Sequence, residues 1–241
     1  MTIRSTVLTA CVALGLLIGA GCAAPLRTTV TPFRPPESYP SSTRIEGLVL
    51  AVDPVDTEEH STRVFGTDLR TAEVLPLHLI ARNTGSHEFE INAAQIFGMT
   101  AGGEFAGAYT LHQASQRVRE SSIGTTAATG LAVGALAGAA AGAAIGGAAG
   151  GGEGAATGAA VGGAVGGVGG VAEGTSDTIT SRFKRELAAQ DFGDRVIAPG
   201  NIEHGFVYLT WQPYTSVRIK VFDITTNKVH EVQLPITIRR P

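Results

Sequence analysis

The sequence predicts an all-β sandwich that is interrupted by an inserted α-helical hairpin rich in glycine. Strand patterns occur in two separate regions, residues 43–110 and 191–241, and neither region alone has enough strands for two packed sheets. Between them, every fourth residue from Gly130 to Gly174 is glycine without interruption. Residues four apart lie above one another on a helix, so this register favours a helix over a flexible linker.

Residues 1–21 have the pattern of an export signal. Arg4 precedes an apolar run, Val7–Gly19, that is too short to cross a bilayer as a helix. The run ends in LLIGAGCAA, in which small residues stand directly before Cys22. This stretch resembles the lipobox of bacterial lipoproteins. The resemblance implies cleavage before Cys22 and an N-acyl diacylglyceryl anchor on it, whereas the alternative is an ordinary secretory signal with an unrelated cysteine.

Residues 22–42 are expected to form the lipid anchor and a tether. By analogy with lipoprotein sorting, alanine rather than aspartate after Cys22 implies the outer membrane, with the folded part facing the periplasm. The segment contains five prolines among Thr, Ser and Arg, a composition that favours extended backbone. Twenty such residues at about 3.1 Å each reach roughly 60 Å, so the folded part can stand well off its anchor.

The composition argues against several classes of function. Cys11 leaves with the signal and Cys22 is acylated, so the mature chain keeps no disulfide. Without Arg4 the chain has 17 basic against 21 acidic residues and no basic stripe, which argues against nucleic acid as a partner. The sequence contains no Gly-Lys-Ser/Thr phosphate loop and no G-x-S-x-G motif.

An acidic stretch is the only candidate for a metal site, and its spacing matches no calcium loop. The stretch comprises Asp53, Asp56, Glu58, Glu59 and His60, which we expect in one loop. We expect His78 at an outward strand position and His204 in a turn. The sequence therefore predicts a protein that is not an enzyme and that has no cofactor and no metal.

The first β region, residues 43–110, contains a clear hairpin. Leu75, Leu77 and Leu79 alternate with other residues at a period of two, and the turn residues Asn83–Ser86 follow before Phe89 resumes the pattern. This region also contains the apolar stretches RIEGLVLAV and QIFGMTAGGEF.

The second β region, residues 191–241, shows the same chemistry. Pro199–Gly200 supplies a turn, Val217, Ile219 and Val221 alternate, and Thr225–Lys228 connects them to a last strand. About seven strands in two halves match a single immunoglobulin-like (Ig-like) sandwich whose halves pair across the insert.

The pattern also resembles a broad family of bacterial lipoprotein Ig-like domains. In that family an apolar strand runs into an Asn-x-Gly/Ser turn, here Asn83–Gly85, and a later Pro-Gly turn precedes Gly-Phe-Val-Tyr, here Gly205–Tyr208. The resemblance supports the architecture and indicates no ligand.

The insert, residues 111–190, is predicted to be a helical hairpin with a glycine zipper over residues 127–174. Its periodic, helix-packing glycines are Gly130, Gly134, Gly138, Gly142, Gly146, Gly150, Gly154, Gly158, Gly162, Gly166, Gly170 and Gly174. In a water-exposed helix these residues would together cost roughly 10–12 kcal/mol relative to alanine. A bilayer or close helix–helix packing would compensate this cost.

The charges divide the insert into two arms. No charged residue occurs between Glu120 and Glu153 or from Gly154 to Ala172, and each arm suffices for the about 20 residues of a spanning helix. A glycine edge with a four-residue period drifts about 40° per step around the helix. One neighbouring helix cannot follow it, so we expect each helix to contact its hairpin partner and then another protomer in a homo-oligomer.

The glycine register, the two uncharged arms and the lipobox together resemble the glycine-zipper two-transmembrane lipoproteins of the outer membrane, the SlyB type. The resemblance covers about 45 residues of the 241. It implies membrane insertion, oligomerisation and a role in envelope organisation. In this chain the zipper interrupts an Ig-like domain, which departs from that family.

Amphipathic helical stems are expected on both sides of the zipper. Leu111, Ser115 and Val118 recur at helical spacing before it, and Ile179, Phe183 and Leu187 after it, with Ser176 or Asp177 as N-cap. The basic residues of the stems either reach anionic lipid headgroups or form salt bridges with the interleaved acidic residues.

Two functions remain in consideration. The first is a structural outer-membrane lipoprotein whose zipper inserts in the bilayer and self-associates, for envelope organisation or pore formation. The alternative is a lipid-tethered periplasmic binding module that docks another envelope protein, with a flexible Gly/Ala-rich insert.

Overall fold

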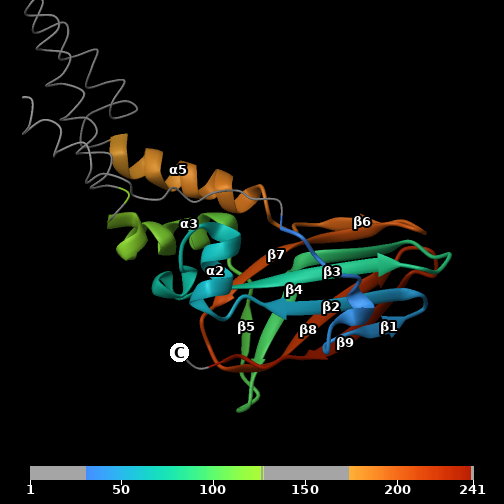
Figure 1. The fold of residues 1–241 in the computed structure, drawn as a ribbon. Helices are drawn as coiled ribbons and strands as arrows, with labels where there is room; N and C mark the ends of the chain where they lie inside the picture. The colour runs from blue at the N-terminus through green and yellow to red at the C-terminus, as the bar shows by residue number, and fades with distance from the viewer. Residues whose placement is uncertain (1–30, 126, 128–173, 240–241) are drawn as a thin grey trace, which may run out of the picture. The chain divides into compact units, whose positions relative to one another are not determined.

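The structure, a computed structural model, describes residues 31–125, 127 and 174–239 (Figure 1). The chain divides into two compact units, one of Met1–Pro25 with Gly124–Ile179 and the other of Leu26–Ile123 with Thr180–Pro241. The second unit contains every strand described below. The described residues of the first unit that follow Ile123 are helical.

Two antiparallel sheets form the second unit. Sheet A has the order β1–β2–β3–β7, with β1 at Thr43–Ile45, β2 at Leu48–Pro54, β3 at Val74–Asn83 and β7 at Ile202–Thr210. Sheet B has the order β5–β4–β8–β9, with β4 at Phe89–Thr100, β5 at Phe105–Gly107, β8 at Tyr214–Asp223 and β9 at Lys228–Pro235. A short strand β6, Arg195–Ile197, pairs with β4. The prediction of an all-β sandwich is confirmed at this level.

The two halves of the sequence pair with one another. β3 lies beside β7 with Leu77 opposite Val207, and β4 lies beside β8 with Ile96 opposite Ile219. The sandwich therefore contains strands from both sides of the insert, as the sequence predicted.

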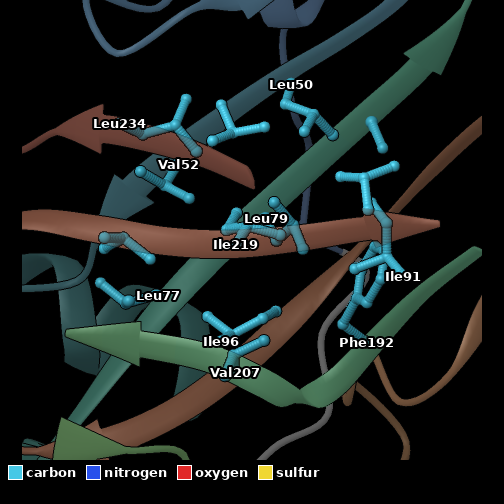
Figure 2. Packing of buried hydrophobic residues seen from close by; sticks show 14 of the residues in the cluster. Leu50, Val52, Leu77, Leu79, Ile91, Ile96, Phe192, Val207, Ile219 and Leu234 are labelled. Atoms are coloured by element: carbon cyan, nitrogen blue, oxygen red, sulfur yellow. The ribbon is translucent and has the colours of Figure 1, made fainter. Parts of the chain in front are cut away.

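The core lies between the two sheets and is formed by the inward-facing side chains of both (Figure 2). Leu50 and Leu79 come from sheet A, and Ile219 and Leu234 from sheet B, and each is at most 1% exposed. Burial of a side chain of this size stabilises the fold by about 1.5–3 kcal/mol. The alternation of apolar residues at a period of two in the sequence thus correctly predicts which residues form this inner layer.

Asn83 joins the two halves at one end of the sandwich. Its side-chain amide donates to the carbonyl oxygens of His87 at 2.6 Å and Ile197 at 2.9 Å, and its backbone amide donates to that of Asn201 at 2.9 Å. The side chain is 1% exposed. Its neighbour Gly85 cannot be replaced by a larger residue, because an added Cβ would lie 2.7 Å from the carbonyl oxygen of Glu46.

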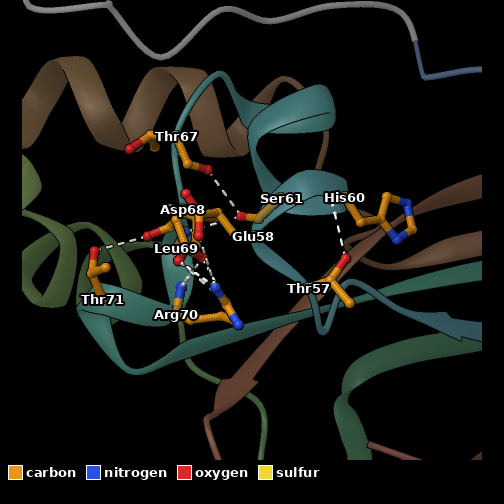
Figure 3. Close-up of polar contacts among 9 residues, drawn as sticks. All are labelled: Thr57, Glu58, His60, Ser61, Thr67, Asp68, Leu69, Arg70 and Thr71. Carbon is orange, nitrogen blue, oxygen red and sulfur yellow. Dashed lines mark hydrogen bonds and ion pairs between the residues drawn. The ribbon is translucent and has the colours of Figure 1, made fainter. Parts of the chain in front are cut away.

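The acidic stretch is not a loop, which corrects the prediction. After β2 the chain forms helix α2, Glu58–Phe65, and a short 3-10 helix η2, Leu69–Ala72. The hydroxyl of Thr57 caps α2 by accepting from the amide of His60 at 3.2 Å (Figure 3). The two glutamates occupy the first turn, where carboxylates interact favourably with the helix dipole.

Ser61 holds α2 and η2 together (Figure 3). Its fully buried hydroxyl donates to the carbonyl oxygen of Thr67 and accepts from the amide of Leu69, both at 2.9 Å. Asp68 caps η2 by accepting from the amide of Arg70 at 3.1 Å, and the guanidinium of Arg70 also contacts the Asp68 carboxylate at 2.8 Å.

Helices cover the outer face of sheet A. The ring of Phe65 in α2 packs against Phe206 of β7 at 5.1 Å between centroids. The 3-10 helix η1, Pro36–Ser38, precedes Tyr39, which packs on Ala51 and Ile80 of the same face. β3 is consequently buried on both faces, and Arg82 is its only exposed residue.

The two stems of the insert belong to this helical layer. Helix α3, Leu111–Glu120, begins with a capping box of Thr110 and Gln113 and buries Val118. Helix α5, Gly174–Ala188, buries Phe183 and Leu187. Both amphipathic stems are therefore present, but α5 already contains Ser176 and Asp177, so the predicted N-cap is wrong. Within the described part of the chain, no helix is both long and apolar enough to cross a membrane.

Candidate functional site

The residues that the sequence singled out lie largely outside the described part of the chain. This holds for Cys22 and for the eleven periodic glycines from Gly130 to Gly170. Gly174 is the first residue of α5. The lipidation site and the glycine zipper thus stay predictions.

The described residues form a groove of about 450 Å³ beside the stems of the insert. Five segments line it: the middle of β4, the connection from β5 into α3, one turn of α5, the loop after α5, and β7. The lining residues are Ala93, Ala94, Ala108, Tyr109, Thr110, Leu111, His112, Lys184, Asp191, Gly193, Asp194, Val207 and Tyr208. A volume of this size lies within the range of small-molecule sites.

A β-bulge in β4 opens the groove. β4 pairs with β6 up to Ile91 and with β5 from Phe97, and its register against β8 shifts between Ile91 and Ile96. Ala93 and Ala94 lie in this interval, and their small side chains leave space above the strand. Bulges re-aim side chains and end strand pairing, and they are frequent beside functional sites.

Two tyrosines fix the wall of the groove. The amide of Tyr109 donates to the carbonyl oxygen of Tyr208 at 2.7 Å, and the hydroxyl of Thr210 donates to that of Tyr109 at 2.8 Å. The hydroxyl of Tyr208 donates to the carbonyl oxygen of Leu187 in α5 at 2.9 Å. Burial raises the pKa of Tyr208 well above 10, so this hydroxyl stays a donor. The wall is thereby attached both to sheet A and to α5.

Asp191 is the most perturbed carboxyl group of the groove. Its partial burial raises its pKa to about 6, Asp194 adds to the rise, and Arg195 opposes it. The guanidinium of Arg195 is engaged elsewhere, because it donates to the carbonyl oxygen of Phe192 at 2.7 Å and pairs with Glu203 at 3.4 Å. Desolvated carboxyl groups in concave sites are candidates for binding or proton transfer.

The remaining ionisable groups of the groove come from the helices. Lys184 lies in α5 and His112 in the first turn of α3, and both are exposed. Asp194 accepts a hydrogen bond from the amide of Ala93 at 3.3 Å, which attaches the loop after α5 to the bulge. The groove therefore combines an apolar floor with the carboxyl groups of Asp191 and Asp194 and the side chains of Lys184 and His112.

A histidine pair lies apart from the groove, on the covered face of sheet A. Nε2 of His78 and Nδ1 of His204 are 3.2 Å apart, and Phe206 stacks on His78 at 4.6 Å. Phe33 packs on His204 at 3.9 Å between ring centroids. His204 was expected in a turn, but it lies within β7. His78 is on the outer face as expected, and the helical layer leaves only 4% of it exposed.

The environment keeps this pair neutral. Burial lowers the pKa of His78 to about 4, with smaller contributions from His204 and His60. Burial also lowers the pKa of His204. No group of three or more His, Cys, Asp or Glu residues among the described ranges is arranged to hold a metal ion.

The basic residues of the stems mostly pair with acidic neighbours. Arg117 contacts Glu73 at 3.2 Å, and Arg182 contacts Glu186 at 3.0 Å. Arg119 contacts Glu120 at 2.9 Å. These contacts favour salt-bridged stems, one of the two interpretations that the sequence left open.

Searches of family models, curated proteins and solved structures found no match to this chain.

Sequence reasoning missed the groove. Lys184 was only one of the basic residues of the stems, and Asp191 and Asp194 were not considered together with the bulge in β4. A weak signal was available, since Asp191-Phe-Gly-Asp194 directly follows the amphipathic pattern of α5. Nothing in the sequence places Ala93 and Ala94 beside that loop.

Proposed function

We propose that the chain is a non-enzymatic outer-membrane lipoprotein in which a β-sandwich displays an inserted glycine-zipper hairpin that enters the bilayer and self-associates. The main support is the way the sandwich unit holds both stems. It includes the chain up to Ile123 and again from Thr180. Both α3 and the following part of α5 bury apolar side chains in this unit.

We further infer that the sandwich is Ig-like. In an Ig-like sandwich the strands A, B and E share one sheet and C, F and G the other. β2, β3 and β7 have the connectivity of A, B and E, and β4, β8 and β9 that of C, F and G. The short β6 pairs with β4 rather than with β7, so it takes the place of an edge strand that joins the second sheet.

The attachment of the stems favours a structural role for the insert. Phe183 and Leu187 are at most 3% exposed, and Tyr208 bonds to the backbone of α5. Ordering these helices costs conformational entropy, which only a large number of buried contacts offsets. An insert that was only a flexible loop would not need a packed helix at each of its ends.

The membrane part of the proposal rests on the sequence. The lipobox at Cys22, the uncharged arms and the four-residue glycine register support an anchored hairpin. Close contact between glycine edges, within the hairpin and between protomers, would compensate the low hydropathy of the arms. The resulting homo-oligomer would organise the envelope or form a pore.

Membrane retention without the lipid tests this proposal. A Cys22→Ala variant behind an ordinary cleavable signal removes the anchor and leaves the insert unchanged. We expect it to sediment with membranes and to resist carbonate extraction. A second variant that also lacks residues 127–174 serves as the control and should be released. Complete release of the first variant would overturn the insertion of the hairpin.

Self-association has its own test. Replacing Gly138, Gly142, Gly158 and Gly162 with leucine raises hydropathy and prevents close approach of the helices. We expect continued membrane insertion and the loss of cross-linked oligomers. Cross-linked oligomers in undiminished yield would contradict packing through the glycine edges.

The second candidate function is a tethered periplasmic binding module. The groove beside the stems is the observation that favours it, because it joins a cavity to a desolvated carboxyl group. Release of the anchor-free protein from membranes, combined with ligand binding in the groove, would support this candidate.

A further inference from the structure

We propose that the groove between the β4 bulge, α3 and α5 binds a small ligand that carries a primary ammonium group on an apolar body, with Asp191 as the ammonium partner. This site is independent of membrane insertion. It uses only residues of the sandwich unit, so its test and the tests of the proposed function can fail separately.

The first step is that Asp191 has no cationic partner at ion-pair distance among the described residues. The nearby Arg195 is bonded to Phe192 and Glu203. A carboxylate that is partly removed from water gains most from a charged hydrogen-bond donor.

The second step concerns the charge of the ligand that the groove would bind. Asp191 and Asp194 both line it, and their mutual repulsion is relieved by a cation. Lys184 and His112 approach from the helices and are exposed to solvent, where screening weakens their effect. Asp194 is exposed as well, so the half-buried Asp191 dominates and favours a cation.

The third step is the shape of the ligand. The three alanines at positions 93, 94 and 108 provide an apolar floor, and Val207 lies beside them. Tyr109 and Tyr208 also line the groove, and hydrogen bonds hold the hydroxyl groups of both in place. A short aliphatic chain can cover this surface while its ammonium group reaches the loop. A fully hydrated inorganic cation would gain nothing from the apolar floor.

Matched probes test the proposal. Pentylamine, pentanol and pentanoate carry unbranched alkyl chains of similar length and have a cationic, a neutral and an anionic head group. We expect calorimetric titration of the full-length protein at neutral pH to give pentylamine an affinity at least about tenfold higher than that of the other two. Equal affinities for pentylamine and pentanol, or tighter binding of pentanoate, would overturn the proposal.

Variants locate the binding. Asp191→Asn keeps the shape of the side chain and its backbone contacts, and it should weaken pentylamine binding at least about tenfold without affecting pentanol. Glu88→Gln removes an exposed carboxylate from the distant β3–β4 turn and serves as the matched control, with unchanged binding. Thermal melts of both variants check that the fold is intact. Unchanged pentylamine binding by Asp191→Asn would overturn the assignment.

The pH dependence gives a second readout. Because burial raises the pKa of Asp191 to about 6, protonation of its carboxylate should weaken pentylamine binding about tenfold between about pH 7 and pH 5. The other charged or titratable groups near it are Asp194, Arg195, Lys184, His112 and Tyr208. His112→Gln should retain the pH effect, whereas Asp191→Asn should lose it. Loss of the effect in His112→Gln alone would contradict the role of Asp191.

Discussion

The two sheets of the sandwich differ in what covers them. The central strand β3 of sheet A is buried on both faces, and all of its residues except Arg82 are buried. Sheet B is buried on its inner face only, and in the second half of β9 exposed residues alternate with the buried Val232 and Leu234. The comparison shows that α3 and α5 take part in the helical layer that covers sheet A.

The outer faces accordingly have different chemistry. On sheet A the outward side chains include Phe206, which packs on Phe65 of α2, and His78, which stacks on Phe206. On sheet B one row across the strands reads Val196, Glu90, Phe222 and Val229, and the two valines at its ends are more than half exposed. A change on the outside of sheet A should therefore act like a change in a core.

The largest expected difference is between two phenylalanines on these outer faces. Phe206→Ala removes a ring that packs on Phe65 and His78, and we expect a loss of about 3–5 kcal/mol in the free energy of unfolding. Phe222→Ala removes a half-buried ring from sheet B and should cost about 1 kcal/mol. Urea denaturation of the two variants measures both values. Equal losses would contradict the difference in covering.

His78, which the helical layer covers, should change the free energy of unfolding by an intermediate amount when the pH changes. His78 has a pKa of about 4 in the fold and an ordinary value of 6.5. The unfolded chain therefore binds more protons between these values, so His78 makes the protein less stable as the pH falls through this window. The full shift corresponds to about 3 kcal/mol.

A His78→Phe variant isolates this contribution. Asp191, whose pKa is raised to about 6, has the opposite effect on stability over part of the same window. The difference in unfolding free energy between wild type and variant removes that background. We expect this difference to change by about 3 kcal/mol from about pH 7 to pH 4, in favour of the variant. A pH-independent difference would mean that His78 is not desolvated.

The smallest effect is expected on the open face of sheet B. Arg218 and Glu231 form a salt bridge across β8 and β9, with side chains 26% and 54% exposed. A double-mutant cycle with Arg218→Gln and Glu231→Gln should give a coupling of about 0.2–1 kcal/mol that decreases with added salt. A coupling above about 2 kcal/mol would indicate that this face is covered in solution.

The sequence predicted the inner layer of the sandwich well. Alternation in residues 75–79 and 217–221 identified β3 and β8, and the turn residues around Thr225 identified the β8–β9 hairpin. These features are local, because the period of two and the turn chemistry are readable within a few residues. The hairpin predicted around Asn83 is wrong, because β3 and β4 lie in different sheets and the turn after Asn83 connects one sheet to the other.

The covering layer was harder to predict. α2 was interpreted as an acidic loop, although Thr57 as N-cap, two glutamates in the first turn and Gly66 after the end are helix signals. His204 was assigned to a turn because it is close to Pro199–Gly200, whereas pairing with β3 extends β7 over it. Tertiary pairing decided the position of His204, and a single sequence does not show it, whereas the signals for α2 are local and could have been used.

The groove could not be predicted for the same reason. Its floor comes from the bulge in β4, its carboxylates from the loop after α5, and its wall from β7. The bulge in β4 lies about a hundred residues before the other two segments in the sequence, and each segment looks ordinary by itself. Only the fold brings Ala93 and Asp194 to hydrogen-bond distance.

Asn83 has a consequence for the order of events during biosynthesis. Its amide group bonds to Ile197 and its backbone to Asn201, both of which are translated only after the whole glycine-rich segment. β3 and β4 likewise lack β7 and β8 until the ribosome has completed the second half. The glycine-rich segment must therefore emerge while the sandwich is still open.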